Sequence, residues 1–99
     1  MMAKLLENPT PGSILKEMFL DELGMTQTAL ARAIGVPAGR INEIVLGKRV
    51  VTADTDLRLC RYFGLSEGFF LGLQIDYDIE EAKRQSGKEI AKIRPLKAA

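Results

Sequence analysis

The chain has 99 residues, of which 46% are hydrophobic and 27% are charged, and its net charge is +1. This length and balance predict one compact domain and exclude both a disordered chain and a second independent core. Histidine is absent and cysteine occurs once, so the sequence offers no activated nucleophile, no metal-ligand spacing and no phosphate loop. We therefore expect neither an enzyme nor a bound cofactor or metal.

The beginning of the chain, MMAKLLENPTPG, lacks the apolar core and the cleavage site of a secretory signal. No apolar run approaches the roughly 20 residues that a membrane-spanning helix requires. The single cysteine, Cys60, lies in an apolar helical pattern, which predicts a buried thiol that packs as a small hydrophobic group. Together these features predict a cytoplasmic protein that makes no membrane contact.

Helical patterns follow one another along the chain, and the alternation typical of strands is almost absent. Thr10 and Pro11 predict the start of a first helix, which runs through ILKEMFLDEL and ends at Gly24. Apolar spacing and flanking glycines predict a second helix over 27–34 and a third over 38–46. These are the three N-terminal helices of an all-α fold.

Two further helices complete the predicted fold. Thr52 caps the fourth, which ends at Gly64. Its predicted inner residues are Leu57, Cys60 and Phe63. Ser66 is the predicted cap of the fifth helix and Gly87 its predicted end. The sequence therefore predicts an N-terminal arm over 1–10, a five-helix domain over 11–85 and a loose basic tail over 86–99.

The segment MTQTALARAIGVPAGRINEIVLGKR predicts a helix-turn-helix over about 26–46. Ala31 is small enough to let the two helices pack closely, and Gly35 permits the left-handed backbone that the turn requires. Ile41 and Ile44 anchor the second helix, so its opposite face is free to enter a major groove. A helical hairpin with a glycine turn also occurs in other all-helical domains, so a protein-interaction domain remains an alternative.

The free face and its flanks supply the candidate DNA contacts. Arginine pairs with guanine and asparagine with adenine, while small residues let the helix backbone approach the bases. Lysine and arginine after the helix, and glutamine before it, suit phosphates. The predicted contacts are Gln27, Ala38, Gly39, Arg40, Asn42, Lys48 and Arg49. Arg40 and Asn42 are also compatible with solvated surface positions, and Gln27 with a role in capping its own helix.

Charge is distributed unevenly along the chain. Residues 32–65 contain six basic and three acidic residues, 66–82 contain five acidic and no basic ones, and 83–99 contain six basic and one acidic. The first block suits a nucleic-acid surface, although such blocks are also ordinary solvated faces. The acidic run Asp76, Asp78, Glu80 and Glu81 faces solvent or holds a basic partner.

The fifth helix carries more apolar residues than one narrow stripe accommodates. An exposed excess predicts an interface, and a homodimer suits a motif that reads two half-sites of a palindrome. The predicted dimer contacts are Phe69, Phe70, Leu73 and Tyr77. Burial of all of them in the core of one chain is the alternative.

The spacing of Gln27, Leu30-Ala31, Gly35, Ile41 and Gly47 resembles the Cro/C1-type (XRE) helix-turn-helix of phage repressors. Over residues 11–78 the chain also resembles the HigA family of antitoxins, which includes VapI-type proteins. The resemblance rests on Pro11-Gly12, the run RINEI at 40–44, Gly47-Lys48-Arg49, Thr52-Ala53-Asp54-Thr55, Leu73-Gln74 and Tyr77-Asp78. It departs from the family at Phe69-Phe70, where tryptophan is frequent.

This resemblance implies a lambda-repressor-like, five-helix DNA-binding fold. It further implies an antitoxin that binds a RelE-like, mRNA-cleaving toxin and represses its own operon as a homodimer on double-stranded operator DNA. Members of the family also exist without a partner gene, so a stand-alone repressor is the alternative that the resemblance allows.

Overall fold

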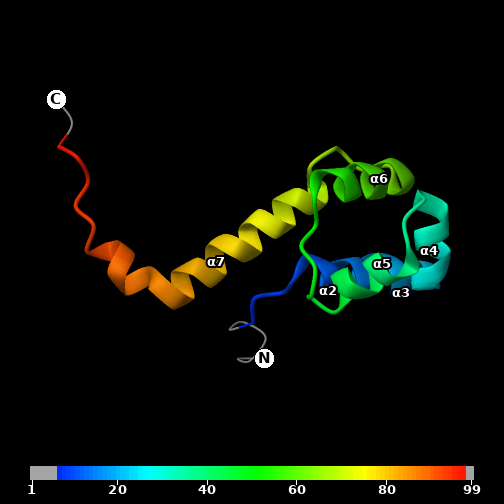
Figure 1. Ribbon diagram of the computed structural model, residues 1–99, viewed down its shortest axis with the longest axis horizontal. Helices are drawn as coiled ribbons and strands as arrows, with labels where there is room; N and C mark the ends of the chain where they lie inside the picture. The colour runs from blue at the N-terminus through cyan, green and yellow to red at the C-terminus, as the bar shows by residue number, and fades with distance from the viewer. Residues whose placement is uncertain (1–6, 98–99) are drawn as a thin grey trace.

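The computed structural model describes residues 7–97, which are helical with short connections and contain no strand (Figure 1). In chain order the elements are α2 (Pro11–Leu15), the π-helical segment η1 (Lys16–Leu20), α3 (Asp21–Leu23), α4 (Gln27–Ile34), α5 (Ala38–Val45), α6 (Ala53–Phe63) and α7 (Phe69–Ala91). The first three are continuous and form one helix. The described range therefore contains five helices, and the predicted all-α class is confirmed. None of these helices is long and apolar enough to cross a membrane.

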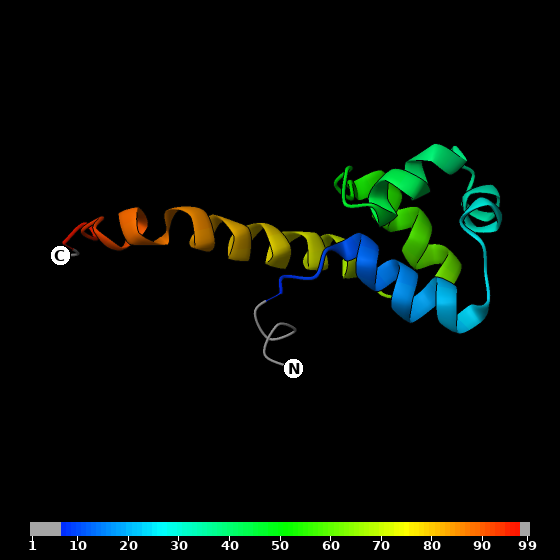
Figure 2. The same cartoon turned by 90° about the horizontal axis from the view of Figure 1, so that it is seen from below.

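The molecule has two parts of different shape. The helices from α2 to α6 and the start of α7 form a head, whereas the rest of α7 projects away from it (Figures 1 and 2). The radius of gyration is 16.5 Å, larger than the roughly 13 Å of a compact 100-residue domain. The projection explains this excess.

Local capping residues fix the predicted helix starts in the head. The side chains of Thr10, Thr26 and Thr52 each accept a hydrogen bond from the backbone N–H three residues later. Each bond satisfies a donor that has no partner inside the helix. The predicted boundaries of the first four helices are thus confirmed to within one or two residues.

The core of the head is a single apolar cluster. It consists of Leu15, Leu20, Leu30, Ala31, Ile34, Val36, Ile41, Ile44, Val51, Leu59, Cys60 and Phe70. The prediction that Cys60 is buried is confirmed. The prediction for Leu57 is wrong, since its side chain is exposed and Leu59 is the residue that α6 buries.

The fifth helix starts two residues later than predicted, and its predicted end is wrong. Helix α7 begins at Phe69 instead of after Ser66, because the buried carboxylate of Asp56 in α6 caps it. This carboxylate accepts hydrogen bonds from the N–H groups of Gly68 (2.7 Å), Phe70 (2.8 Å) and Leu71 (3.0 Å).

At its other end, α7 continues through Gly87 to Ala91. A glycine inside a helix costs only about 1 kcal/mol relative to alanine, which is too little to end a long helix by itself. The first residues of the predicted loose tail, including Ile90, are therefore helical. Residues 93–97 follow without regular structure.

Candidate nucleic-acid interface

Helices α4 and α5 form the predicted helix-turn-helix. Gly35 ends α4 with a φ of 74°, a left-handed conformation that favours glycine. The N–H of Val36 donates to the carbonyl of Ala31 at 3.0 Å and closes the turn. Ile41 and Ile44 of α5 are fully buried, so one side of this helix is fixed and the other side is free.

Close contact with the first helix fixes the position of α5. A methyl group at Gly12 in α2 would overlap the backbone carbonyl of Ile44 and would lie 2.9 Å from the Cα of Val45. Only glycine permits this approach of two backbones. The resemblance singled out Pro11-Gly12 without a physical reason, and the packing of α2 on α5 supplies that reason.

Two of the predicted DNA contacts lie together although they come from different helices. The Nδ2 of Asn42 in α5 donates to the Oε1 of Gln27, the first residue of α4, at 3.1 Å. Asn42 is exposed, and a Cβ at Gly39 would meet no atom within 4 Å. Ala38, at the start of α5, is exposed too. The outer face of α5 is thus lined by small residues and by an amide pair.

Arg40 lies at the edge of this face, beside α6. Its Nη1 is 3.9 Å from the Oδ2 of Asp54, and its side chain is 33% exposed. The expectation that Arg40 lies opposite Ile41 and Ile44 is therefore corrected. Asp54 also accepts a 2.9 Å hydrogen bond from the Nε of Arg58, so two guanidinium groups share one carboxylate.

The two basic residues after α5 differ in their surroundings. Arg49 donates through its Nε to the Oε1 of Glu43 at 2.7 Å. Lys48 is exposed, and its side chain makes no hydrogen bond or salt bridge to residues 7–97. Of the two, Lys48 is the cation that no internal partner neutralises in the described part of the chain.

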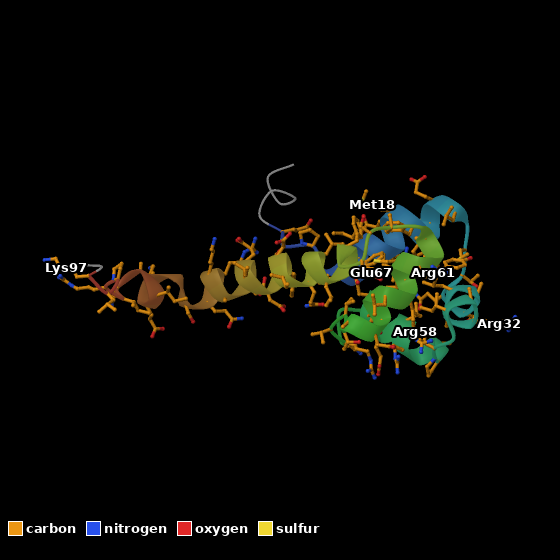
Figure 3. The ribbon with its side chains drawn as sticks, turned by 90° about the horizontal axis from the view of Figure 1, so that it is seen from above. Met18, Arg32, Arg58, Arg61, Glu67 and Lys97 are labelled. Carbon is orange, nitrogen blue, oxygen red and sulfur yellow. The ribbon has the colours of Figure 1, made fainter. Side chains whose placement is uncertain are left out.

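Arg58 of α6 also belongs to this region, although no motif in the sequence pointed to it. Its Nη1 donates to the carbonyl of Ile34 at 2.8 Å, at the end of α4 and next to the turn. Arg58 thereby ties α6 to the helix-turn-helix. In Figure 3, Arg32, Arg58 and Arg61 lie on the head, while Lys97 lies at the far end of the molecule.

The predicted dimer contacts on α7 do not share one exposed face. Phe70 is fully buried within the chain, so its side chain offers no surface to a second copy. Leu73 packs against the core, and the backbone carbonyl of Tyr77 accepts a hydrogen bond from Asn8. Phe69, at 41% exposure, is the most accessible of the four.

A family model described as helix-turn-helix matches residues 15–70, more than half of the chain. The chain belongs to the helix-turn-helix family. Virulence-associated protein I of Dichelobacter nodosus is 46% identical over 86 residues, which cover 87% of this chain and 79% of the relative. This helix-turn-helix protein thus has the VapI-type relative that its sequence predicted.

Solved structures extend the comparison. The Pseudomonas aeruginosa antitoxin HigA with the higBA promoter is 40% identical, with a TM-score of 0.85, over 92% of this chain and all of that one. A P. aeruginosa protein in complex with its 28-bp operator DNA is 41% identical, with a TM-score of 0.86, over 91% of this chain and all of that one. The predicted membership of the HigA group is confirmed.

Proposed function

We propose that this helix-turn-helix protein is a sequence-specific transcriptional repressor and the antitoxin of a HigB/HigA-type module. Acting in the cytoplasm as a homodimer, it binds a palindromic operator in double-stranded DNA, represses its own operon and neutralises a RelE-like, mRNA-cleaving toxin. The likeness to HigA with its promoter supports the DNA-binding part of this proposal. The toxin is inferred from the family resemblance.

The observation that carries the DNA-binding part is the outer face of α5. Its backbone is held rigidly from behind, by the contact with Gly12 and by two fully buried isoleucines, while its front carries small residues and the exposed amide of Asn42. A rigid helix with an accessible, polar and sterically open face suits insertion into a major groove. Lys48, just after the helix, suits a flanking phosphate.

Two variants separate base reading from phosphate contact. If Arg40 pairs with a guanine, Arg40→Ala weakens operator binding by roughly 1–3 kcal/mol per half-site and relaxes the preference at that base pair. Lys48→Ala weakens binding to all duplexes alike and reduces the salt slope by about one. The measurement is a fluorescence-anisotropy titration of the chain's own upstream DNA and a scrambled duplex at several salt concentrations.

The structure makes Asn42→Ala the matched comparison for Arg40→Ala. Arg40 must leave Asp54 to reach a base, whereas Asn42 already lies on the open face beside Gln27. Equal losses on both duplexes for Arg40→Ala would limit Arg40 to the DNA backbone and assign base reading to Asn42. Absence of binding to any duplex would overturn the repressor proposal and favour a helical protein-interaction domain.

The antitoxin part requires a separate experiment. Co-expression of this chain with the neighbouring gene product should restore growth that the product alone inhibits. The acidic run of α7 is an unfavourable toxin surface, because three of its four carboxylates bind within the chain, to Gln74, Arg84 and Asn8. Operator binding without rescue of growth would support the stand-alone repressor instead.

A further inference from the structure

The loop between α5 and α6 carries the basic residues Lys48 and Arg49 and runs past the beginning of α7 (Figure 1). Helix α5 fixes where this loop begins, because the N–H of Lys48 donates to the carbonyl of Glu43 at 2.8 Å. The next two residues, Arg49 and Val50, make no hydrogen bond through their backbone N–H groups within residues 7–97. At Val51 the loop is bonded again, and the acceptor is a side chain of α7.

That side chain is the amide of Gln74. Its Oε1 accepts the hydrogen bond from the N–H of Val51 at 3.0 Å, and its Nε2 donates to the Oδ1 of Asp78 at 3.0 Å. Asp78 lies one turn further along α7, and a carboxylate only accepts hydrogen bonds. The NH₂ group of Gln74 therefore faces Asp78, and the amide oxygen is turned towards the loop.

Both partners of the bond between the loop and α7 are buried. Gln74 is 9% exposed and Val51 is 3% exposed, beside a cavity of about 130 Å³ that Lys48 also lines. Burial of an amide is costly unless its oxygen and its NH₂ group are both bonded, and here they are. An apolar side chain in place of Gln74 would leave the N–H of Val51 without a partner.

The two loop cations, Lys48 and Arg49, lie between two anchors. The bond to α5 precedes them and the bond to α7 follows them. A side chain reaches a phosphate at lower entropic cost when the backbone that carries it is already ordered. Without Gln74, the second anchor would be the apolar packing of Val51, which is non-directional and does not fix the path of the loop.

We propose that Gln74 is a positioning residue for DNA binding, which through the N–H of Val51 holds the two loop cations where they meet phosphates. Asp78 orients the amide for this bond. The inference rests on the proposed function and adds residues of α7 to a site that otherwise consists of α4, α5 and the loop. It leaves base reading to α5, which the contact with Gly12 fixes independently.

Gln74→Met tests the inference, because methionine keeps the unbranched shape but has no amide. In an anisotropy titration it should bind the operator and a scrambled duplex alike roughly tenfold more weakly than the wild type, because the loop must be ordered on binding. The salt slope should fall as well, because fewer phosphates are contacted. Gln85→Met makes the same change at an exposed position of α7 and should bind like the wild type.

A double-mutant cycle distinguishes positioning from a general loss of stability. Its background is Lys48→Ala/Arg49→Ala, which removes both loop cations. If Gln74 acts through these cations, Gln74→Met should weaken binding by at most about twofold in this background. An equal loss in both backgrounds would show that Gln74 affects DNA binding by another route and would overturn the inference.

An exchange of donor and acceptor provides a rescue. In Gln74→Glu/Asp78→Asn, the carboxylate at position 74 accepts from the N–H of Val51 and from the amide at position 78. Affinity and salt slope should return close to those of the wild type, in protein that circular dichroism shows to be folded. If Gln74→Met does not fold, Gln74→Asn replaces it, because its amide is one methylene too short to reach Val51. A folded exchange variant that binds as weakly as Gln74→Met would overturn the inference.

The outcomes also separate this inference from the proposed function. A wild type that does not bind the operator would overturn both. If the wild type binds and the loss of both loop cations has no effect, the loop does not contact DNA, and only the inference is overturned. If that loss weakens binding but folded Gln74→Met binds like the wild type, the repressor proposal stands and Gln74 does not position the cations.

Discussion

The head and the projecting half of α7 are helical for different reasons. In the head, threonine caps and left-handed glycines delimit α4 and α6, and all the helices share one apolar core. Residues 82–91 lie outside this core, and within residues 7–97 their only side-chain hydrogen bond is the local pair of Arg84 with Glu80. Short helices in water gain most of their stability from packing. The comparison indicates that the head is a folding unit, whereas the projection lacks such tertiary support within residues 7–97.

Asp56 joins these two regions. Its carboxylate lies in α6, is 1% exposed, and holds the first turn of α7 through three backbone N–H groups. The thiol of Cys60 lies 3.5 Å from its Oδ1. The junction is therefore a buried charge that the surrounding donors stabilise, and α7 leaves the head in a defined direction.

Gly12→Ala should have the largest effect on the head. The added methyl group overlaps the carbonyl of Ile44, so α2 and α5 must separate. We expect a loss of roughly 3 kcal/mol in the free energy of unfolding, at the upper end of the cost of overpacking. Urea denaturation measures it. An unchanged midpoint would show that the close approach of the two helices is not required.

Asp56→Asn should cause the second-largest loss in the free energy of unfolding. The amide replaces one acceptor oxygen by an NH₂ donor, which then faces backbone N–H groups. The expected loss is about 2 kcal/mol at pH 7. Asp54→Asn is the matched control, since Asp54 is an exposed acid in the same helix. A similar loss in both variants would contradict the special role of the buried carboxylate.

The same variant gives a dependence on pH. Burial raises the pKa of the Asp56 carboxyl, but hydrogen bonds from Gly68, Leu71, Cys60 and Phe70 outweigh it and the pKa is lowered. A lowered pKa stabilises the fold above the unfolded value of about 3.9, and this contribution disappears as the pH falls below it. The stability difference between wild type and Asp56→Asn should therefore be largest near neutral pH and should shrink as the pH falls below about 4.

Local signals predicted the head well. The caps at Thr10 and Thr52 and the turn at Gly35 were confirmed because each depends on residues a few positions away. The cap by Asp56 was missed because it joins α6 to α7 across the fold. The end at Gly87 was missed because a single glycine is a weak signal in a long helix.

The sequence predicted the buried residues of the candidate site but not the positions of all its surface side chains. Helical periodicity predicts that Ile41 and Ile44 are buried, and the structure confirms this. It does not predict that Arg40 lies beside Asp54 of α6, at the edge of the outer face of α5. On α7, a period of 3.6 residues separates Phe70 from Ile75 and Ile79. The apolar excess predicted for the fifth helix is thus divided between two faces of α7, with Phe70 buried and Ile75 and Ile79 exposed.

Gly39→Ala separates stability from binding within the head. A Cβ there meets no atom within 4 Å, so alanine should raise the free energy of unfolding by up to about 1 kcal/mol through helix propensity. The same methyl group lies on the face proposed to meet DNA, so operator affinity should fall. Urea denaturation and anisotropy titration of one preparation measure both. Unchanged affinity would show that the DNA does not approach Gly39.

The smallest effect comes from a matched pair of glycines in α7. Gly72 lies where α7 packs on the head, and Gly87 lies in the projection; a Cβ at either position meets no atom within 4 Å. Alanine at each should favour the helix by about 1 kcal/mol. At Gly72 this should raise the urea midpoint of the whole head, because that part of α7 unfolds with it. At Gly87, in protein dilute enough to be monomeric, it should only slow amide hydrogen exchange over 83–91. An equal rise of the midpoint for both variants would show that the projection and the head unfold together, and that α7 stabilises the head along its entire length.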